Sequence, residues 1–243
     1  MEDITDKLVN KRTLASRAIA IGDYPSGKRL YENILEIEPN DIEAMFFVVY
    51  CSILAKKKKD YKVDCSVFYK NMKLVFDNLK QETISLENKK EQGTMFVKYT
   101  KEFCDVLLSQ AEEEYEKLEE KNSEKDDYNS TAWYEYGDNK RKVYKVMASV
   151  CAFAVDAQLD LQDCRHEVLD MATQSLDFYG KDSKNYICDV LRQIRSMLLD
   201  AMEERGDNVA KEREADKKHK EILYNEAVEE KVKQKISDII SGR

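Results

Sequence analysis

Residues that break regular structure are scarce in this chain, which has seven glycines and two prolines among 243 residues. Combined with a charged fraction of 36%, this scarcity favours helices and excludes a sheet of short strands joined by turns. The length is compatible with one elongated helical array or with two small domains. The chain is long enough to bury a real hydrophobic core.

Residues that commonly carry catalysis or bind metals are also few, with histidine at positions 166 and 219 alone. Cys164 and His166 are two residues apart, which points their side chains to different faces of a helix. The sequence has no glycine-rich phosphate loop, no nucleophile elbow and no His-Glu-x-x-His spacing. We therefore expect no metal site, no cofactor and no enzymatic activity. A helical enzyme with an unrecognised carboxylate site is the alternative, because sequence spacing does not exclude clusters in space.

Long apolar runs are absent. The amino terminus has no apolar stretch of the kind found in signal peptides, and the run from Ala44 to Ala55 is too short to span a membrane. The cysteines are scattered without a Cys-x-x-Cys pair, several of them on apolar helix faces. These six residues are Cys51, Cys65, Cys104, Cys151, Cys164 and Cys188. We predict reduced core cysteines in a cytoplasmic protein with no membrane partner.

Charge is unevenly distributed along the chain. The formal net charge is −8, and residues 110 to 127 hold nine acidic side chains against three lysines. Proteins that bind nucleic acid usually have clustered positive charge instead, so we expect no nucleic-acid partner. The basic run from Lys56 to Lys59, followed by Lys62, comes after an apolar helix. We interpret it as complementing the negative carboxyl end of that helix, with an anion-binding patch as the alternative.

Apolar residues recur at spacings of three and four along most of the chain, as in helices that bury one face. Glycine commonly ends a helix, and it stands between these stretches at positions 22, 93, 137, 180 and 206. The helices predicted in this way cover residues 3–21, 25–37, 41–57, 64–81, 94–120, 138–159, 163–178, 184–205 and 208–240.

The predicted fold is all-α, with about nine helices stacked as antiparallel pairs, because the connections are mostly short. From Ala44 to Ala55 every residue except Ser52 is apolar, so this helix should be the most deeply buried. Residues 122–131 interrupt the periodicity with turn formers and charges. We interpret them as a loop within one array over residues 1–243, and the alternative is a division into residues 1–121 and 131–243.

Near the amino terminus, Leu14, Gly22, Tyr24, Tyr31 and Pro39 are spaced as in a tetratricopeptide repeat, which residues 8–41 resemble. The resemblance implies two paired helices joined by a tight turn at Gly22, with the two tyrosines between them and the proline ending the second helix. The chain departs from the repeat pattern at Lys11, where an aromatic residue is usual, and at Gly27 and Ile34, where small residues such as alanine are usual. The rest of the chain is not covered.

Proteins with this repeat are typically binding scaffolds, so the resemblance implies a scaffold or adaptor that binds a protein or peptide in a groove between stacked helices. An alternative rests on the apolar stripe of Val228, Val232, Ile236 and Ile239 in the last predicted helix. Such a stripe could pair with a second copy and make the chain a structural homo-oligomer.

A candidate site outside any groove lies where aromatic residues adjoin the acidic segment. Exposed aromatic side chains with a polar rim are typical of the residues that dominate binding at protein interfaces. We predict that Trp133 anchors an apolar contact and that nearby carboxylates attract a basic partner. The predicted partner-binding residues are Glu113, Glu116, Trp133, Tyr134 and Tyr136, with Tyr128 in the same segment, which we expect to be irregular.

Overall fold

The computed structural model describes residues 4–81, 84–123, 130–157, 163–179, 186–214 and 216–217. All regular structure in these residues is helical, which confirms the predicted all-α array. The helices are α1 (Ile4–Ala20), α2 (Tyr24–Leu35), α3 (Ile42–Leu54), α4 (Tyr61–Leu79), α5 (Leu86–Ser123), α6 (Ser130–Asp156), α7 (Arg165–Tyr179) and α8 (Tyr186–Glu204). The chain divides into two compact units, residues 1–171 and 172–243.

Aspartate begins three consecutive helices. The carboxylates of Asp23, Asp41 and Asp60 accept hydrogen bonds from backbone N–H groups three residues later, at distances of 3.2, 2.7 and 3.1 Å. Each bond satisfies an N–H group that has no partner within its own helix. Gly22 follows α1 and Gly206 follows α8 with φ angles of 77° and 82°, so these two glycines end helices as predicted.

Two other glycines do not end helices, and the predicted starts at 94 and 138 are wrong. Helix α5 begins at Leu86 and passes through Gly93, while α6 begins at Ser130 and passes through Gly137. Glycine inside a helix costs about 1 kcal/mol relative to alanine, which the packing of a long helix can offset. The segment predicted to be irregular is thereby shortened from both sides, and residues 124–129 lie outside the described part of the chain.

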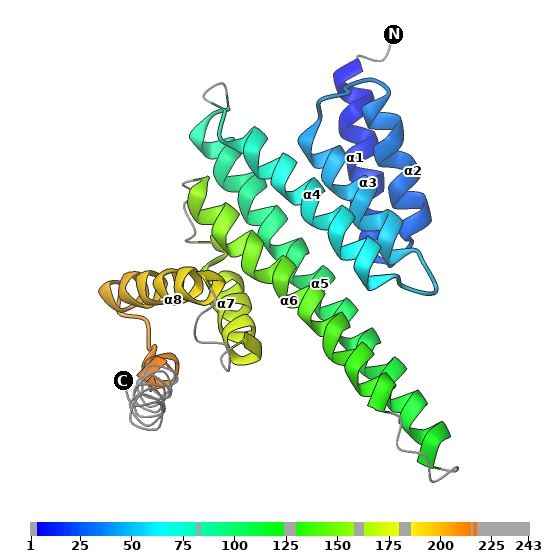
Figure 1. Cartoon of the computed structure of the whole chain (residues 1–243). Helices are drawn as coiled ribbons and strands as arrows, with labels where there is room; N and C mark the ends of the chain where they lie inside the picture. The colour runs from blue at the N-terminus through cyan, green and yellow to red at the C-terminus, as the bar shows by residue number, and fades with distance from the viewer. Residues whose placement is uncertain are drawn as a thin grey trace, which may run out of the picture. The chain divides into compact units, whose positions relative to one another are not determined.

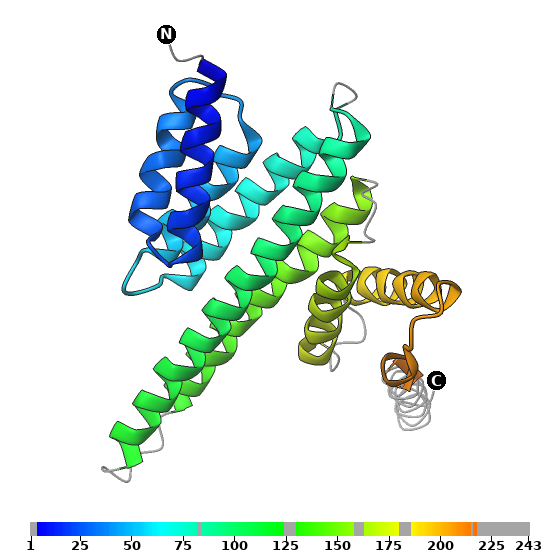
Figure 2. The same ribbon diagram turned by 180° about the vertical axis from the view of Figure 1, so that it is seen from behind.

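In the first unit the helices pack in sequence, with α1 against α2, α2 against α3 and α3 against α4. Helix α6 then packs against both α4 and α5, and α3 also contacts α5. Figures 1 and 2 show α5 and α6 side by side over most of their length. Their green ends, near residues 123 and 130, extend beyond α1 to α4 in both views. Within the described residues of the first unit, the end of this hairpin therefore lies beyond α1 to α4.

Helix α3 supplies the centre of this unit, with seven of its 13 residues buried, as its apolar sequence predicts. Phe46, Phe47 and Tyr50 form a cluster of rings with residues of α2, α4 and α5. In the same cluster Phe68 of α4 and Phe103 of α5 stack with their ring centroids 3.8 Å apart. These contacts fix α5 against α3 and α4, and α5 in turn positions α6.

Helices α1 and α2 approach each other closely at Gly27. A Cβ atom at this position would lie 3.1 Å from Ile19 Cγ1 and 3.3 Å from Cys51 Sγ, so even the alanine usual in the repeat would be tight. Tyr31 is fully buried and stacks on Phe47 at 4.9 Å. Leu14 of α1, by contrast, is 52% exposed.

In the second unit, a short helical segment at residues 210–214 follows α8. Arg195 of α8 is buried and donates a hydrogen bond of 2.9 Å to the backbone oxygen of Glu212. Residues 218–243 lie outside the described part of the chain, and with them the apolar stripe proposed for self-association. No helix in the described ranges is both long and apolar enough to cross a membrane.

Candidate partner-binding surface

The predicted aromatic residues lie on the first turns of α6 and not in an irregular segment, because the helix begins at Ser130. Trp133 is 54% exposed and Tyr134 is 68% exposed, and their rings meet edge to face with centroids 5.3 Å apart. Tyr128, which was grouped with them in the sequence, lies outside the described residues. The helix therefore holds two large exposed rings in fixed positions near the end of the hairpin.

A second pair of rings joins α5 to α6 beside these residues. Tyr136 stacks on Tyr115 of α5, with centroids 4.6 Å apart and planes 13° apart, and the Lys140 ammonium lies 4.9 Å from the Tyr136 ring. Tyr136 is thus partly covered. Its ring packs between α5 and α6 and is less available to a partner than an exposed ring. We refer to Tyr115, Trp133, Tyr134 and Tyr136 together as the aromatic surface.

The carboxylates of α5 point in several directions around this helix. At 100° per residue, Glu119 and Glu112 lie within about 60° of Tyr115, Glu116 lies at about 100°, and Glu113 lies at about 160°. The Tyr115 hydroxyl donates a hydrogen bond to Glu119, whereas Glu113 pairs with Lys117 at 3.5 Å. The fold therefore brings Glu116 to the edge of the aromatic surface and points Glu113 away from it.

Sequence reasoning missed Tyr115 and Glu119 as members of this surface. Their spacing of four residues on one helix was visible in the sequence and places them on the same face. Their proximity to α6 was not visible, because it depends on how the hairpin pairs Tyr115 with Tyr136.

A separate cavity of about 610 Å³ lies where the α3–α4 connection meets α5 and α6. It is lined by four acidic residues, Asp60, Glu114, Glu135 and Asp138, by four lysines, Lys58, Lys59, Lys62 and Lys142, and by Tyr61 and Asn139. The residues that α6 contributes are centred about 170° around the helix from Trp133. The cavity and Trp133 are therefore on opposite sides of α6, whereas Tyr134 and Tyr136 lie about 90° and about 110° around the helix from the cavity residues.

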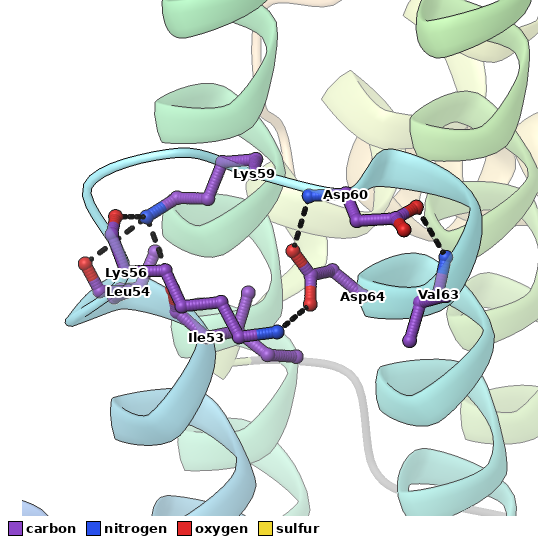
Figure 3. Close-up of polar contacts among 7 residues, drawn as sticks. All are labelled: Ile53, Leu54, Lys56, Lys59, Asp60, Val63 and Asp64. Atoms are coloured by element: carbon purple, nitrogen blue, oxygen red, sulfur yellow. Dashed lines mark hydrogen bonds and ion pairs between the residues drawn. The ribbon is translucent and has the colours of Figure 1, made fainter.

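The α3–α4 connection at this cavity is held by the basic run, as Figure 3 shows. The buried Lys59 ammonium donates hydrogen bonds to the backbone oxygens of Ile53 at 3.0 Å, Leu54 at 3.1 Å and Lys56. Lys56 pairs with the buried Asp64, which also accepts a hydrogen bond of 2.9 Å from the Asp60 N–H group. The prediction that this run complements the carboxyl end of α3 is confirmed for Lys59.

Burial lowers the pKa of Lys59 from its ordinary value, while the charge of Asp64 opposes this change. At the other side of the cavity, an ion pair with Lys142 lowers the pKa of Asp138. A carboxylate held in its charged form is suited to binding cations and not to donating a proton.

The remaining sequence candidates are not brought together. Cys164 is buried and His166 is exposed. Across the described ranges, no three side chains of histidine, cysteine, aspartate or glutamate come together as metal ligands would. In the described residues, the candidate binding sites are therefore the aromatic surface and the larger cavity, both on the α5–α6 hairpin.

Comparisons of the chain with models of known protein families, with curated proteins and with solved structures gave no match.

Proposed function

We propose that this chain is a non-enzymatic scaffold or adaptor that binds a protein partner through the aromatic surface at the end of the α5–α6 hairpin. The observation that supports this most directly is the exposure of Trp133 and Tyr134 on an ordered helix. Leaving two adjacent aromatic rings in water forgoes a favourable burial of roughly 1.5–3 kcal/mol per large side chain. A partner that covers both rings recovers this free energy, as at the centre of known interfaces.

The rim of the surface indicates the charge of the partner. Glu112 and Glu119 lie on the same side of α5 as Tyr115, Glu116 lies about 100° around the helix, and Lys140 lies over the ring of Tyr136. These carboxylates attract lysine or arginine side chains and increase the rate of encounter with a basic protein. The partner we propose therefore combines an apolar patch with a basic border.

The scaffold class is supported by the amino-terminal helices. Helices α1 and α2 pair around Gly27 and Tyr31, at positions that matter in the repeat that residues 8–41 resemble. We infer a tetratricopeptide-like protein of the cytoplasm whose stacked helices hold the hairpin in place. The resemblance supports the proposed class of protein, a scaffold, and the aromatic surface is the proposed site of contact with the partner.

Replacement of Trp133 by alanine tests the proposal. The full chain is immobilised, partners from its native source are captured, and the affinity of each identified partner is measured for the wild type and the variant. We expect Trp133→Ala to raise Kd at least fivefold, which is about 1 kcal/mol, with an unchanged helical circular-dichroism spectrum. Leu86→Ala is the control, because Leu86 is also strongly exposed but lies at the other end of α5. Equal affinities of the wild type and Trp133→Ala for all partners would contradict the proposal.

A further inference from the structure

A second and smaller cavity, of about 180 Å³, lies between α4 and α6. The residues that line it include three lysines, Lys62 of α4 and Lys142 and Lys145 of α6. Two hydroxyl groups, from Ser66 and Tyr69, and the thiol of Cys65 complete the side formed by α4. None of the side chains that line this cavity is a carboxylate.

Four side chains around this cavity that can donate hydrogen bonds have no acceptor among the described residues. Lys62, Ser66, Tyr69 and Lys145 make neither a hydrogen bond nor an ion pair with any described residue, whereas Lys142 pairs with Asp138. On α4, Lys73 by comparison pairs with Asp77. Three lysines and no carboxylate line this cavity, and this local excess of positive charge indicates a site for an anion.

The charge balance indicates how many negative charges the anion carries. With Lys142 neutralised by Asp138, two positive charges from Lys62 and Lys145 remain. A phosphate monoester carries roughly −1.5 to −2 at neutral pH, which matches this excess, whereas one carboxylate would leave a positive charge unbalanced. The thiol of Cys65 does not repel an anion, because burial raises its pKa to about 12 and keeps it neutral.

We propose that this cavity binds the phosphate group of a phosphorylated serine or threonine in an extended peptide. Lys62 and Lys142 line the larger cavity described above as well, so the two cavities are neighbours and a peptide bound at one reaches the other. Glu114 and Glu135 line that room and favour a basic residue close to the phosphorylated one. The inference concerns the side of α6 opposite to Trp133 and does not depend on the proposed aromatic contact.

The same carboxylates disfavour the other common carriers of phosphate. A nucleic-acid strand or an anionic membrane would bring several negative charges to Asp60, Glu114 and Glu135 at once. Repulsion of this kind selects a single phosphate with positive neighbours over a continuous row of phosphates. A phosphopeptide fits the alternation of charge across the two cavities.

The test measures binding of the full chain to fluorescent peptide libraries by polarisation. Three libraries share degenerate flanking positions and carry phosphoserine, serine or glutamate at the centre. We expect phosphoserine peptides to bind at least tenfold more tightly than either of the other libraries, with weaker binding as salt increases. In the double variant Lys62→Ala and Lys145→Ala, this preference should be lost. Lys70→Ala serves as the control, since Lys70 is an exposed lysine of α4 that lines neither cavity.

Equal binding of the phosphoserine and serine libraries by the wild type would overturn the proposal without reference to any variant. Glutamate peptides that bind as tightly as phosphoserine peptides would also overturn it. Competition by inorganic phosphate as strong as that by the peptide would show that the cavity takes the free ion and would reject the peptide. Tighter binding to single-stranded DNA or to phosphatidylserine vesicles than to the phosphopeptides would reject it in favour of those polyanions. Retained binding by Trp133→Ala separates this result from the aromatic surface.

Discussion

At the end of α3, the buried side chain of Lys59 satisfies backbone carbonyl groups, and no glycine is present there. Its ammonium lies at the carboxyl end of α3, where it donates hydrogen bonds to the backbone oxygens of Ile53 and Leu54 in the last turn and of Lys56 just beyond it. The helix dipole adds a favourable interaction with the positive charge. Because α3 contributes the central rings of the first unit, the geometry at its end also affects the start of α4 at Asp60.

Replacing Lys59 by methionine should therefore destabilise the protein by about 1–3 kcal/mol, since buried carbonyl groups would lose their hydrogen bonds. Urea unfolding followed by circular dichroism gives this change in the free energy of unfolding. The neighbouring Lys57 is exposed, so Lys57→Ala should change stability by less than about 0.5 kcal/mol. Similar effects of the two substitutions would show that Lys59 does not cap the helix.

Glu43 gives a pH dependence whose sign follows from its environment. Its carboxylate is half-buried and accepts a hydrogen bond of 3.0 Å from the Tyr31 hydroxyl. Burial raises its pKa above the ordinary value, although the bond from Tyr31 and the charge of Arg12 oppose this. In the pH range above the unfolded pKa of about 4.5 the native state then holds more protons than the unfolded state. The contribution of Glu43 to stability is consequently full at low pH and is lost as the pH rises through the raised value.

We expect Glu43→Gln to be as stable as the wild type or more stable at pH 7, because the amide oxygen still accepts from Tyr31 and carries no charge. As the pH falls towards 4.5, the wild type should gain stability relative to this variant. Glu43→Ala, which leaves the Tyr31 hydroxyl without its acceptor, should cost about 1 kcal/mol at pH 7. Chemical denaturation of the three proteins at several pH values measures these differences, and a wild-type advantage that grows with pH would refute the sign.

Among the helices, α6 contains a glycine, Gly137, that the packing does not require and that should lower stability. Gly137 lies inside this helix, and no atom lies within 4 Å of the position that a Cβ would occupy. Its presence therefore reflects no steric requirement in the first unit. Glycine has greater freedom than alanine in the unfolded chain, which costs free energy on folding.

Gly137→Ala should stabilise the protein by about 0.5–1 kcal/mol, as measured by the shift of its urea midpoint. Gly27→Ala is the matched comparison in another helix. It gains the same helical preference, but its methyl group must displace the side chains of Ile19 and Cys51, so we expect it to stabilise less than Gly137→Ala or to destabilise. A larger gain at Gly27 would be inconsistent with the close approach of α1, α2 and α3.

The helices were predictable to the extent that they depend on local periodicity. The apolar spacing located α2, α3, α7 and α8 within a few residues, and the charge run after α3 was interpreted correctly at Lys59. The starts of α5 and α6 were wrong because a glycine was taken as a helix end, although tertiary packing can hold it inside a helix. Trp133 and Tyr134 are exposed, as the candidate site requires, but they lie on a helix and not in an irregular segment, and their role in binding stays a prediction.

What the sequence could not provide is the pairing of distant helices. Lys62 and Lys145 belong to segments that are more than 80 positions apart, and neither is unusual in its local context. They line one cavity only because α6 packs against α4 as well as α5. The pairing of Tyr115 with Tyr136 has the same origin.

In the chain as a whole, the cysteines lie in both compact units, so the reactivity of their thiols can be used to follow the unfolding of each unit. All six are buried and none forms a disulfide bond; five lie in residues 1–171 and Cys188 lies in residues 172–243. Burial raises the thiol pKa to about 12 at Cys51, Cys65 and Cys151 and to about 11 at Cys164. Since the thiolate is the reactive form, the native thiols should be inert towards disulfide reagents near pH 8.

We expect fewer than one thiol per chain to react with Ellman's reagent within minutes in buffer, and all six to react in concentrated urea. The second unit is the smaller one, and small units bury a lower fraction of their surface. Cys188 should therefore become reactive at a lower urea concentration than the other five, giving a step of one thiol that Cys188→Ser removes. If all six thiols become reactive together, the two units unfold as one. If several react in buffer at the rate of a free thiol, the burial of these cysteines is wrong.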